Sequence, residues 1–348
     1  MIKVLYLYSG DRQSKFKGRV GVDYPDTQFY GLNHYDKKNI FAEYKEPIVV
    51  KIFRILFGFR VSHCLSYFFT FRYDIVFGPS LLYAMFFKKI WPTKTHFILF
   101  NLSLVRTIKA NSKNKIKMRV IKWLLKEFDA IVCLSVDQKN FLETNGLLND
   151  KVFFVPLGVD MHYYKPVYEG REKYILSAGR DNGRDYKTVV ELARQMPSEE
   201  FHIVCSKRNM IGIINIPVNV SVFYDLPIKD LISKYKEAKL MLLITHSDNF
   251  LDGADCSGQT VLLESMASGL PVIATKKQYM RDYLAGDEIL FIDNNNNLES
   301  IKMRIETLRN DDLRLKLSKK ARLAIEANLS TFQMARKLAD IFNLVYTN

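Results

Sequence analysis

Cysteine is scarce in this chain, and its few copies are scattered. Only four of the 348 residues are cysteines, and no two of them form a Cys-x-x-Cys pair. Disulfide frameworks and structural zinc sites use closely and regularly spaced cysteines. The sequence therefore predicts a reduced, cytoplasmic protein that has neither. The six histidines also lack metal-ligand spacing such as His-x-x-x-His, so we expect no metal site.

Long uninterrupted hydrophobic runs are missing as well. The apolar start of the chain stops at Gly10-Asp11, which is too early for a signal peptide and suits a strand that turns. The most apolar stretch, residues 48–71, is interrupted by Lys51, Arg54 and Arg60. Each charge at the centre of a bilayer costs about 2.5–3.5 kcal/mol. We therefore expect a helix that packs on a sheet there, with grazing contact to a membrane left open.

Acidic residues are few in the first half of the chain. Residues 1–165 contain 26 Lys and Arg but only 13 Asp and Glu, whereas the remainder contains 25 and 24, and the net charge is +14. A basic half suits an acidic partner, such as nucleic acid, anionic lipid headgroups or a phosphorylated substrate. No nucleic-acid recognition motif accompanies the charge, so we do not expect binding to nucleic acid.

Apolar runs of strand length are abundant, and helical patterns separate them. Such continuous apolar strands are typical of parallel sheets that are covered on both faces. The runs form two sets, 3–8, 74–78, 96–101, 129–135 and 151–156, then 173–179, 201–206, 219–224, 239–245, 270–275 and 288–292. The sequence therefore predicts an α/β protein with two doubly wound, Rossmann-like domains facing each other across a cleft.

The boundary between these domains is expected near residue 160. The segment 156–170 contains two prolines and two glycines, a composition typical of a linker. We predict an N-terminal, acceptor-binding domain over 1–160 and a C-terminal domain over 161–330. Residues 331–348 are expected to form a helix that packs back toward the first domain. Ligand would bind beyond the carboxyl ends of the strands.

One segment, ADCSGQTVLLESMASGLPVIAT (254–275), contains signals for both the start and the end of a helix. We expect a helix from Gln259 to Ser268, ended by Gly269. Ser257 and Gly258 would stand at its entrance. Free backbone N–H groups and the positive end of the helix dipole favour an anion such as phosphate at that position.

Glu264 lies about one turn inside this helix, on the same face as Thr260, which precedes it by four residues. From there its carboxylate could accept hydrogen bonds from a diol such as ribose. The alternative is that Glu264 faces solvent and that the helix is an ordinary core helix.

A second segment, SAGRDNGRDYK (177–187), brings two arginines to the carboxyl end of a predicted strand. The guanidinium groups of Arg180 and Arg184 could clamp a diphosphate bidentately. The alternative is that they pair with nearby acids, Asp181 and Asp185.

With these segments the chain resembles glycosyltransferase family 4, which has the GT-B fold. The resemblance covers nearly the whole chain and is strongest from VFFVPLGVDMHYYKP (152–166) to LPVIAT (270–275). It implies a retaining enzyme that needs no metal or other cofactor. The implied reaction moves a hexose-type sugar from a UDP- or GDP-sugar to a glycan or lipid-linked acceptor, in surface polysaccharide or glycolipid synthesis.

The resemblance also implies roles for individual residues. Glu264 would bind the ribose of the donor, and Arg180 and Arg184 would hold its phosphates. Backbone groups near the donor would come from Gln259, Thr260 and Val261. The family's first glutamate, which holds the donor sugar, falls eight residues before Glu264, where this chain has Cys256. Asp255 or Asp252 is expected to supply the missing carboxylate.

The family often has a glycine-rich turn after its first strand. Here Gly10 and a basic loop with Arg12, Lys15, Lys17 and Arg19 occupy that place. This loop could hold an acidic or diphosphate-linked acceptor, or it could simply be a solvated surface loop.

Residues 106–126 contain eight Lys and Arg and no acid. Apolar residues recur there at helical spacing, so we predict one basic amphipathic helix that packs its apolar stripe on the sheet. Its basic side could lie on an anionic membrane surface, at the inner face of the membrane, or face solvent alone.

Two other functions stay open. One is a sugar-nucleotide epimerase of the same fold, which would need acids or bases placed at the sugar. The other is a non-catalytic partner subunit of GT-B fold, which Cys256 keeps open.

Overall fold

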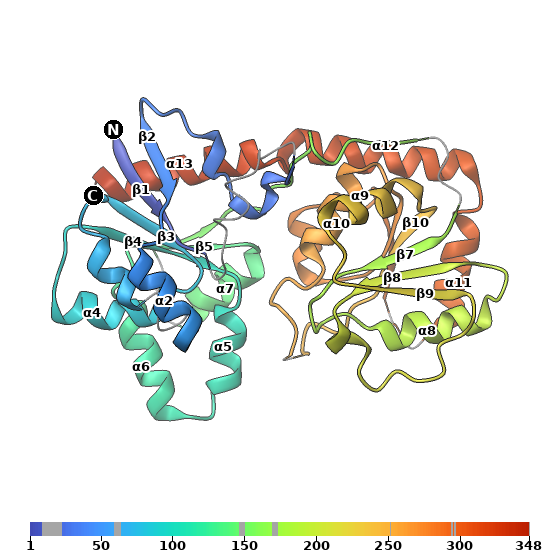
Figure 1. The fold of residues 1–348 in the computed structure, drawn as a ribbon, viewed down its shortest axis with the longest axis horizontal. Coiled ribbons are helices and arrows are strands. Elements are labelled where there is room, and N and C mark those ends of the chain that lie inside the picture. Colours follow the sequence, from blue (N-terminus) through green and yellow to red (C-terminus); the bar gives the residue numbers. More distant parts are fainter. Residues whose placement is uncertain are drawn as a thin grey trace. The chain divides into compact units, whose positions relative to one another are not determined.

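The computed structural model describes residues 1–8, 23–58, 64–145, 150–168, 173–250, 252–293, 295 and 297–347. They form two compact units. Of the described residues, the first unit contains 1–8, Asp26–Pro156 and 331–347, and the second contains 23–25 and Leu157–Ser330. Within the described residues each unit is built on a sheet of six strands (Figure 1).

The sheet of the first unit has the strand order β2-β1-β3-β4-β5-β6, and all neighbouring strands are parallel. Its strands are β1 (Ile2–Tyr6), β2 (Ile40–Tyr44), β3 (Ile75–Gly78), β4 (His96–Asn101), β5 (Ala130–Cys133) and β6 (Val152–Phe154). The helices of this unit are α2 (Ile48–Phe57), α4 (Met85–Ile90), α5 (Leu104–Asn111), α6 (Lys115–Leu125), α7 (Val136–Thr144) and α13 (Thr331–Thr347). Figure 1 shows α4, α5 and α6 on one face of the sheet and α13 on the other. Because both faces are covered, β3 and β5 are buried along their whole length.

The sheet of the second unit has the order β12-β11-β10-β7-β8-β9 and is also parallel throughout. Its strands are β7 (Ile175–Ala178), β8 (Phe201–Cys205), β9 (Val220–Tyr224), β10 (Leu240–Leu243), β11 (Val272–Thr275) and β12 (Leu290–Ile292). The helices are α8 (Tyr186–Gln195), α9 (Ile228–Glu237), α10 (Gln259–Ala267), α11 (Leu298–Thr307) and α12 (Asp311–Asn328). Figure 1 shows α8 and α11 on one face and α9, α10 and α12 on the other.

These two parallel sheets confirm the predicted α/β class with two Rossmann-like domains. All eleven expected runs recur as strands, but β2 was not predicted. In β2 only Ile40 is buried, so this edge strand lacks the continuous apolar run on which the prediction depended.

The basic segment 106–126 is not one helix, as the sequence suggested. It contains the end of α5 and the whole of α6, with a break at 112–114. A new helix, α6, begins after Asn114, because the Asn114 side chain accepts a hydrogen bond from the Lys117 N–H (3.0 Å) and caps the helix. Ile116 and Val120, expected in the packed stripe, are exposed. In the described part of the chain no helix has both the length and the apolarity for a membrane crossing.

The strand order locates a ligand crevice in the second unit. The chain runs outward from β7 to β8 and β9, then returns to β10 on the opposite side of β7. The loops that follow β7 and β10 therefore leave the sheet in different directions. In open parallel sheets ligands bind at this switch point, beyond the carboxyl ends of the strands.

Candidate functional site

Two loops meet at the switch point of the second sheet, and glycines allow them to touch. A Cβ on Gly253 would lie 2.9 Å from the Cα of Gly183, and a Cβ on Gly183 would overlap the Ser257 hydroxyl. Any larger side chain at either position would push the loops apart. The loop after β7 and the loop after β10 thus form one surface.

The Asp181 carboxylate links these two loops through hydrogen bonds. Its Oδ1 accepts hydrogen bonds from the Gly183 N–H (2.8 Å) and from the Ser257 hydroxyl (2.5 Å). Its Oδ2 accepts from the Ala254 N–H (3.0 Å). The sequence offered Asp181 only as an ion-pair partner for an arginine. Its structural role was missed because its partners lie in a loop more than 70 residues away.

The entrance of α10 lies in this surface and is open. Gly258 precedes the helix with φ of 86°, in the left-handed region that favours glycine, and no side chain caps the helix. The Gly258 carbonyl accepts from the Leu262 N–H (2.9 Å), as expected for the first helical turn. The N–H groups of Thr260 and Val261 belong to the first turn, which has no intrahelical acceptor for them. Such an end binds anions well.

The side chain of Arg184 is buried beside this entrance. Only 4% of the residue is exposed, and a Cβ on Gly258 would lie 3.2 Å from its Nη1. Its Nη2 donates to the Ala178 carbonyl at the end of β7. Its Nε and Nη1 are buried and have no hydrogen-bond partner among the residues that the structure describes. A buried guanidinium with unpaired donors is costly, and an anion at the helix entrance would satisfy it.

Arg180 differs from Arg184 in both its exposure and its partners. Its side chain is 59% exposed, and its Nε pairs with Asp225 Oδ1 (3.2 Å) just beyond β9. Its Nη2 also approaches the Leu226 carbonyl (3.5 Å). The partners that the sequence suggested, Asp181 and Asp185, are therefore not the ones seen. In this structure the two arginines contact different groups.

Glu264 is buried inside the unit, so the solvent-facing alternative is wrong. It is 5% exposed. Its Oε1 accepts from the Tyr164 hydroxyl (2.8 Å) and its Oε2 from the Tyr235 hydroxyl (3.0 Å). Burial, followed by the nearby Glu264 charge, raises the pKa of both phenols well above their usual range. Both tyrosines therefore remain protonated donors that hold the carboxylate in place.

Sequence reasoning did not find these two tyrosines. Tyr164 precedes Glu264 by 100 residues and Tyr235 precedes it by 29. Tyr164 lies in the segment that carried the family resemblance, and this was its only signal. Tyrosine is too common in this chain, with 19 copies, for its type alone to indicate a site.

The remaining predicted residues lie in or near the same turn. Asp255 and Cys256 are half-buried before α10, and Gln259 is buried with its N–H donating to the Cys256 carbonyl (3.2 Å). The Ser257 hydroxyl is used by Asp181, and its carbonyl accepts from the Tyr279 hydroxyl (3.2 Å). Gly10 and the basic loop that follows it lie outside the described residues.

The aspartates of the loop after β10 have protein partners. Asp248 pairs with Lys277 (2.8 Å), and Asp252 accepts from the Asn182 amide (3.1 Å). Within the described ranges no group of three or more His, Cys, Asp or Glu residues is placed to hold a metal ion. Beside the positive end of α10, the positively charged side chain described at the helix entrance is that of Arg184.

The chain is similar to known proteins in both sequence and structure. Residues 168–324 match the family described as "Glycosyl transferases group 1". No curated protein sequence matches the chain. Among solved structures, it is similar to sucrose-phosphate synthase from Thermosynechococcus elongatus, with a TM-score of 0.71, 16% identity and 99% of each chain covered.

Two further structures are similar. Anabaena HepE in complex with UDP-glucose has a TM-score of 0.71 and 10% identity, with 99% of this chain and 100% of HepE covered. TarM, solved from S. aureus, has a TM-score of 0.60 and 17% identity, with 81% of this chain covered. This chain spans 58% of the length of TarM. Residues 168–324 are therefore similar to the group 1 glycosyl transferases, and the two Rossmann-like sheets give the chain the GT-B fold.

Proposed function

We propose that the protein is a retaining glycosyltransferase. It would move a hexose-type sugar from a nucleotide-diphosphate donor to a glycan or lipid-linked acceptor, in surface polysaccharide or glycolipid synthesis. The observation that carries the proposal is the buried guanidinium of Arg184 beside the uncapped entrance of α10. Two unpaired donors there suit the pyrophosphate of such a donor.

Charge stabilisation would be the main catalytic device. Negative charge develops on the diphosphate as its bond to the sugar breaks, and preorganised donors lower the barrier by binding that charge. Arg184 Nε and Nη1 and the N–H groups of Thr260 and Val261 are the proposed donors. The acceptor hydroxyl would attack on the face from which the diphosphate leaves, and a phosphate oxygen would take its proton.

Arg180 is proposed as a second phosphate ligand that changes partner. It is exposed and ion-paired with Asp225 in this structure, and exposed pairs contribute only about 0–1 kcal/mol. Such a pair opens at little cost, so the guanidinium is free to swing to a bound phosphate. Its role is therefore proposed to depend on donor binding, unlike that of Arg184.

Glu264 is proposed to hold the ribose of the donor. Each of its carboxylate oxygens accepts one tyrosine hydrogen bond, and a carboxylate oxygen can accept more than one. The structure of HepE contains UDP-glucose, which supports a nucleotide sugar as the donor here, with UDP- and GDP-sugars both to be tested. Asp255, next to Cys256, is the proposed carboxylate for the donor sugar.

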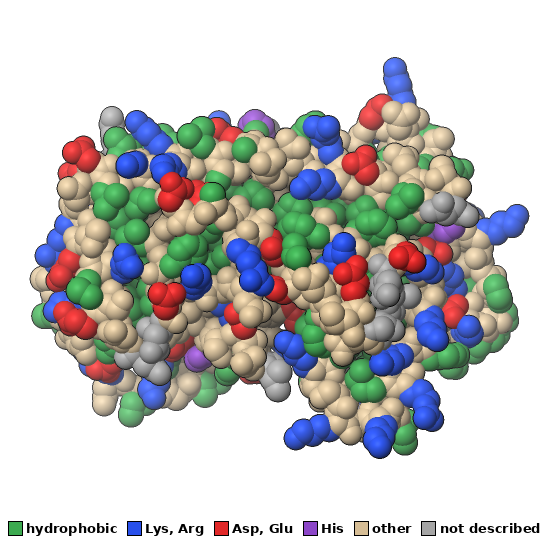
Figure 2. Space-filling view, turned by 180° about the vertical axis from the view of Figure 1, so that it is seen from behind, with side chains coloured by type: hydrophobic (Ala, Val, Ile, Leu, Met, Phe, Trp, Pro, Cys, Tyr) green, Lys and Arg blue, Asp and Glu red, His purple; other side chains and the backbone are tan. Residues whose placement is uncertain are grey.

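Contact with an anionic membrane is proposed for residues 106–126. On the face shown in Figure 2, Lys and Arg side chains gather at the lower projecting end, over α5 and α6. The segment contains no acid, and each basic residue near an anionic surface contributes about 1 kcal/mol. A cytoplasmic protein bound to the inner face of the membrane would meet a lipid-linked acceptor there.

A thermal-shift screen over nucleoside diphosphates and their sugars tests the donor site. A ligand at a hundred times its dissociation constant stabilises a protein by about 2.7 kcal/mol. We expect a uridine or guanosine diphosphate to raise the melting temperature of the wild type and of the control Arg304→Met, an exposed arginine on α11. Arg184→Met should lose the response. Absence of any nucleotide response, or an equal response in Arg184→Met, would contradict the proposal.

Product analysis separates the other functions. An epimerase would convert the nucleotide sugar without an acceptor, which product NMR would detect. A non-catalytic subunit would bind without transfer or hydrolysis of the donor by the purified protein.

A further inference from the structure

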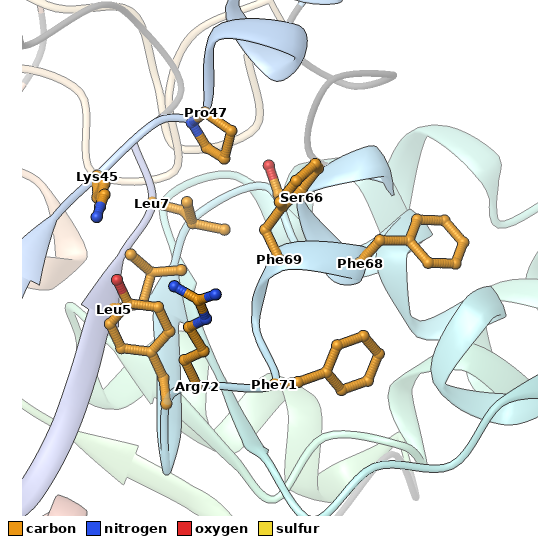
Figure 3. A pocket seen from close by; sticks show the side chains of 10 residues that line it. Leu5, Leu7, Lys45, Pro47, Ser66, Phe68, Phe69, Phe71 and Arg72 are labelled. Atoms are coloured by element: carbon orange, nitrogen blue, oxygen red, sulfur yellow. The ribbon is translucent and has the colours of Figure 1, made fainter.

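A cavity of about 390 Å³ opens on the first unit (Figure 3), and none of the residues assigned to the donor lines it. Leu5 and Leu7, at the end of β1, form part of its wall. Lys45 and Pro47, which follow β2, and the segment 66–73 complete the lining. Ligand pockets typically have volumes of roughly 300–1,000 Å³ and are mostly apolar, so this cavity is large enough for part of a small molecule.

The charge at this cavity is positive. Lys45 and Arg72 are its only charged lining residues among those described, and in that part of the chain neither has a carboxylate partner. Figure 3 shows the guanidinium of Arg72 directed toward Leu5 and Leu7. A cation is thus held against an apolar wall, an arrangement suited to a molecule with an acidic head and an apolar body.

The nearest carboxylates in the sequence already have partners, and the one beside Arg72, Asp74, accepts from the Lys3 N–H (2.7 Å). Glu43 lies opposite Leu5 in the sheet and accepts a hydrogen bond from the Tyr73 hydroxyl (2.7 Å). Glu46 accepts two hydrogen bonds from Arg54, at 2.9 and 3.2 Å. These acids do not neutralise Lys45 and Arg72.

Aromatic rings continue from the rim of the cavity to the basic helix α6. Phe68 contacts Phe87 and Trp91, with ring centroids 5.1 and 6.2 Å apart, and Phe86 contacts Trp123 at 6.3 Å. Phe86 and Phe87 contact each other at 5.8 Å. We call these five residues the aromatic seam. Figure 3 shows the rings of Phe68 and Phe71 pointing to the same side, away from Arg72.

Both tryptophans of the chain belong to the aromatic seam. They are 54% and 39% exposed, although large aromatic residues are usually well buried. Helix α2, which begins directly after Pro47, adds Ile48, Ile52 and Ile55 as exposed side chains. Exposed apolar surface of this kind marks an interaction site. Tryptophan next to lysine and arginine is typical of surfaces that lie at a membrane interface.

We propose that this cavity binds an anionic lipid, with the hydrocarbon chain against Leu5 and Leu7 and the acidic headgroup held by Lys45 and Arg72. The aromatic seam lies among the headgroups of the bilayer that supplies the lipid. The apolar lining disfavours a sugar or a nucleotide, and the two free cations disfavour a neutral hydrocarbon. The inference rests on the proposed membrane contact only for the source of the lipid, and it is independent of sugar transfer.

Titration with single-chain amphiphiles below their critical micelle concentrations tests the cavity itself. The full chain is titrated by calorimetry with lysophosphatidylglycerol, lysophosphatidylcholine and glycerol phosphate. We expect saturable binding of the anionic amphiphile, weaker binding of the zwitterionic one, and none of the headgroup alone. Glycerol phosphate that binds as tightly as the lysolipid would reduce the cavity to an anion site and overturn the proposal.

Matched charge variants test the role of the two cations. The double variant Lys45→Gln, Arg72→Gln should bind lysophosphatidylglycerol roughly 25-fold more weakly, because each basic residue near an acidic headgroup contributes about fivefold in affinity. The control, Lys316→Gln with Lys319→Gln, removes the same charge from exposed positions on α12 and should bind normally. Equal affinities in the two double variants would overturn the proposal. Unchanged far-UV circular dichroism shows that neither has lost the fold.

Tryptophan fluorescence with vesicles tests the source of the lipid. Because both tryptophans lie in the aromatic seam, vesicles of phosphatidylglycerol and phosphatidylcholine in equal parts should shift their emission to the blue, and brominated acyl chains should quench it. Phosphatidylcholine vesicles should do neither. A spectrum unchanged by anionic vesicles, together with self-association in sedimentation that Phe68→Ser removes, would assign this face to a second copy of the chain and overturn the proposal.

Discussion

The two units of this protein use the same kind of sheet but place their charged residues in opposite ways. In the second unit, Arg184 and Glu264 are almost completely buried, and hydrogen bonds from distant residues hold the loops around them. In the first unit, Lys45, Arg72 and the basic residues of α6 are exposed beside exposed aromatic rings. The sheet thus determines where a ligand can bind, and the burial of the charges determines what kind of ligand it is.

This difference has an electrostatic cause. A buried cation with unpaired donors is costly in the free protein, so we propose that Arg184 is preorganised for one small anion in one geometry. Exposed cations remain hydrated and are screened within about a Debye length, so those of the first unit suit an extended anionic surface. On the functions proposed above, recognition of a small ligand belongs to the second unit and adhesion to a surface to the first.

The largest effect is expected at Arg184. Removal of a preorganised donor at a site where charge develops typically lowers turnover by about 10²–10³, and we expect this loss in Arg184→Met. The same variant should raise the stability of the unliganded protein by about 1 kcal/mol or more, because it replaces an unpaired buried charge with an apolar side chain. Turnover with a nucleotide sugar and thermal unfolding measure the two effects.

Arg180→Met is the matched variant for this comparison. Because Arg180 is exposed and paired with Asp225, its loss should leave stability within about 1 kcal/mol of the wild type. Its turnover should fall less than that of Arg184→Met. A larger loss of turnover in Arg180→Met would reverse the importance assigned to the buried guanidinium.

A smaller effect, on binding alone, is expected at Glu264. Hydrogen bonds to a charged group contribute about 1.5–3 kcal/mol, so Glu264→Gln should weaken binding of the nucleoside diphosphate by roughly tenfold to a hundredfold. Isothermal titration calorimetry measures this, with the exposed Glu306→Gln on α11 as the control. Binding of the diphosphate that does not differ between the two variants would remove Glu264 from the ribose site.

Each charge removed from the basic face of the first unit should weaken membrane binding by a smaller factor. Replacement of Lys117, Arg119 and Lys122 on α6 by glutamine should weaken binding to anionic vesicles by about fivefold per residue. The effect should disappear at high salt, since exposed charges are screened. Glutamine at Lys236, Lys316 and Lys319 of the second unit removes the same charge. Co-sedimentation in which both triple variants bind equally would show that only net charge matters.

The smallest effect is expected at the other end of the second sheet, at His202 on β8. Burial lowers the pKa of the His202 imidazole. The hydrogen bond from its Nε2 to the Glu200 carboxylate (2.6 Å) opposes this shift, and the Lys234 charge adds to it. Because the folded pKa lies below the unfolded value, the unfolded state binds more protons as the pH falls. Stability should therefore be full above about pH 7 and decline toward about pH 5.

His202→Gln is the test of this pH dependence. The variant should show a flatter dependence of the melting temperature over the same range, whatever its absolute stability. A melting temperature that depends equally on pH in both proteins would assign the effect to other groups. The result would show whether polar burial in the second unit serves stability as well as binding.

Much of this fold could be predicted because its signals are local. Strands buried on both faces need continuous apolar runs, and helix α10 is marked by Gly258 before it and Gly269 after it, both with positive φ. The break between α5 and α6 was also local, since Asn114 is a typical capping residue, but the amphipathic pattern across it obscured the signal. The edge strand β2 carried too little apolar sequence to be recognised.

By itself the sequence determined the alternation of strands and helices, the presence of two sheets and the position of the helix entrance, because each depends on residues close together in the chain. Only the tertiary structure decided that Arg184 is buried and Arg180 is not, that Asp181 joins two loops, and that Tyr164 and Tyr235 hold Glu264. These contacts join residues up to 100 positions apart. They follow from the order of the strands, which brings the carboxyl ends of β7 and β10 together, and no local pattern contains that order.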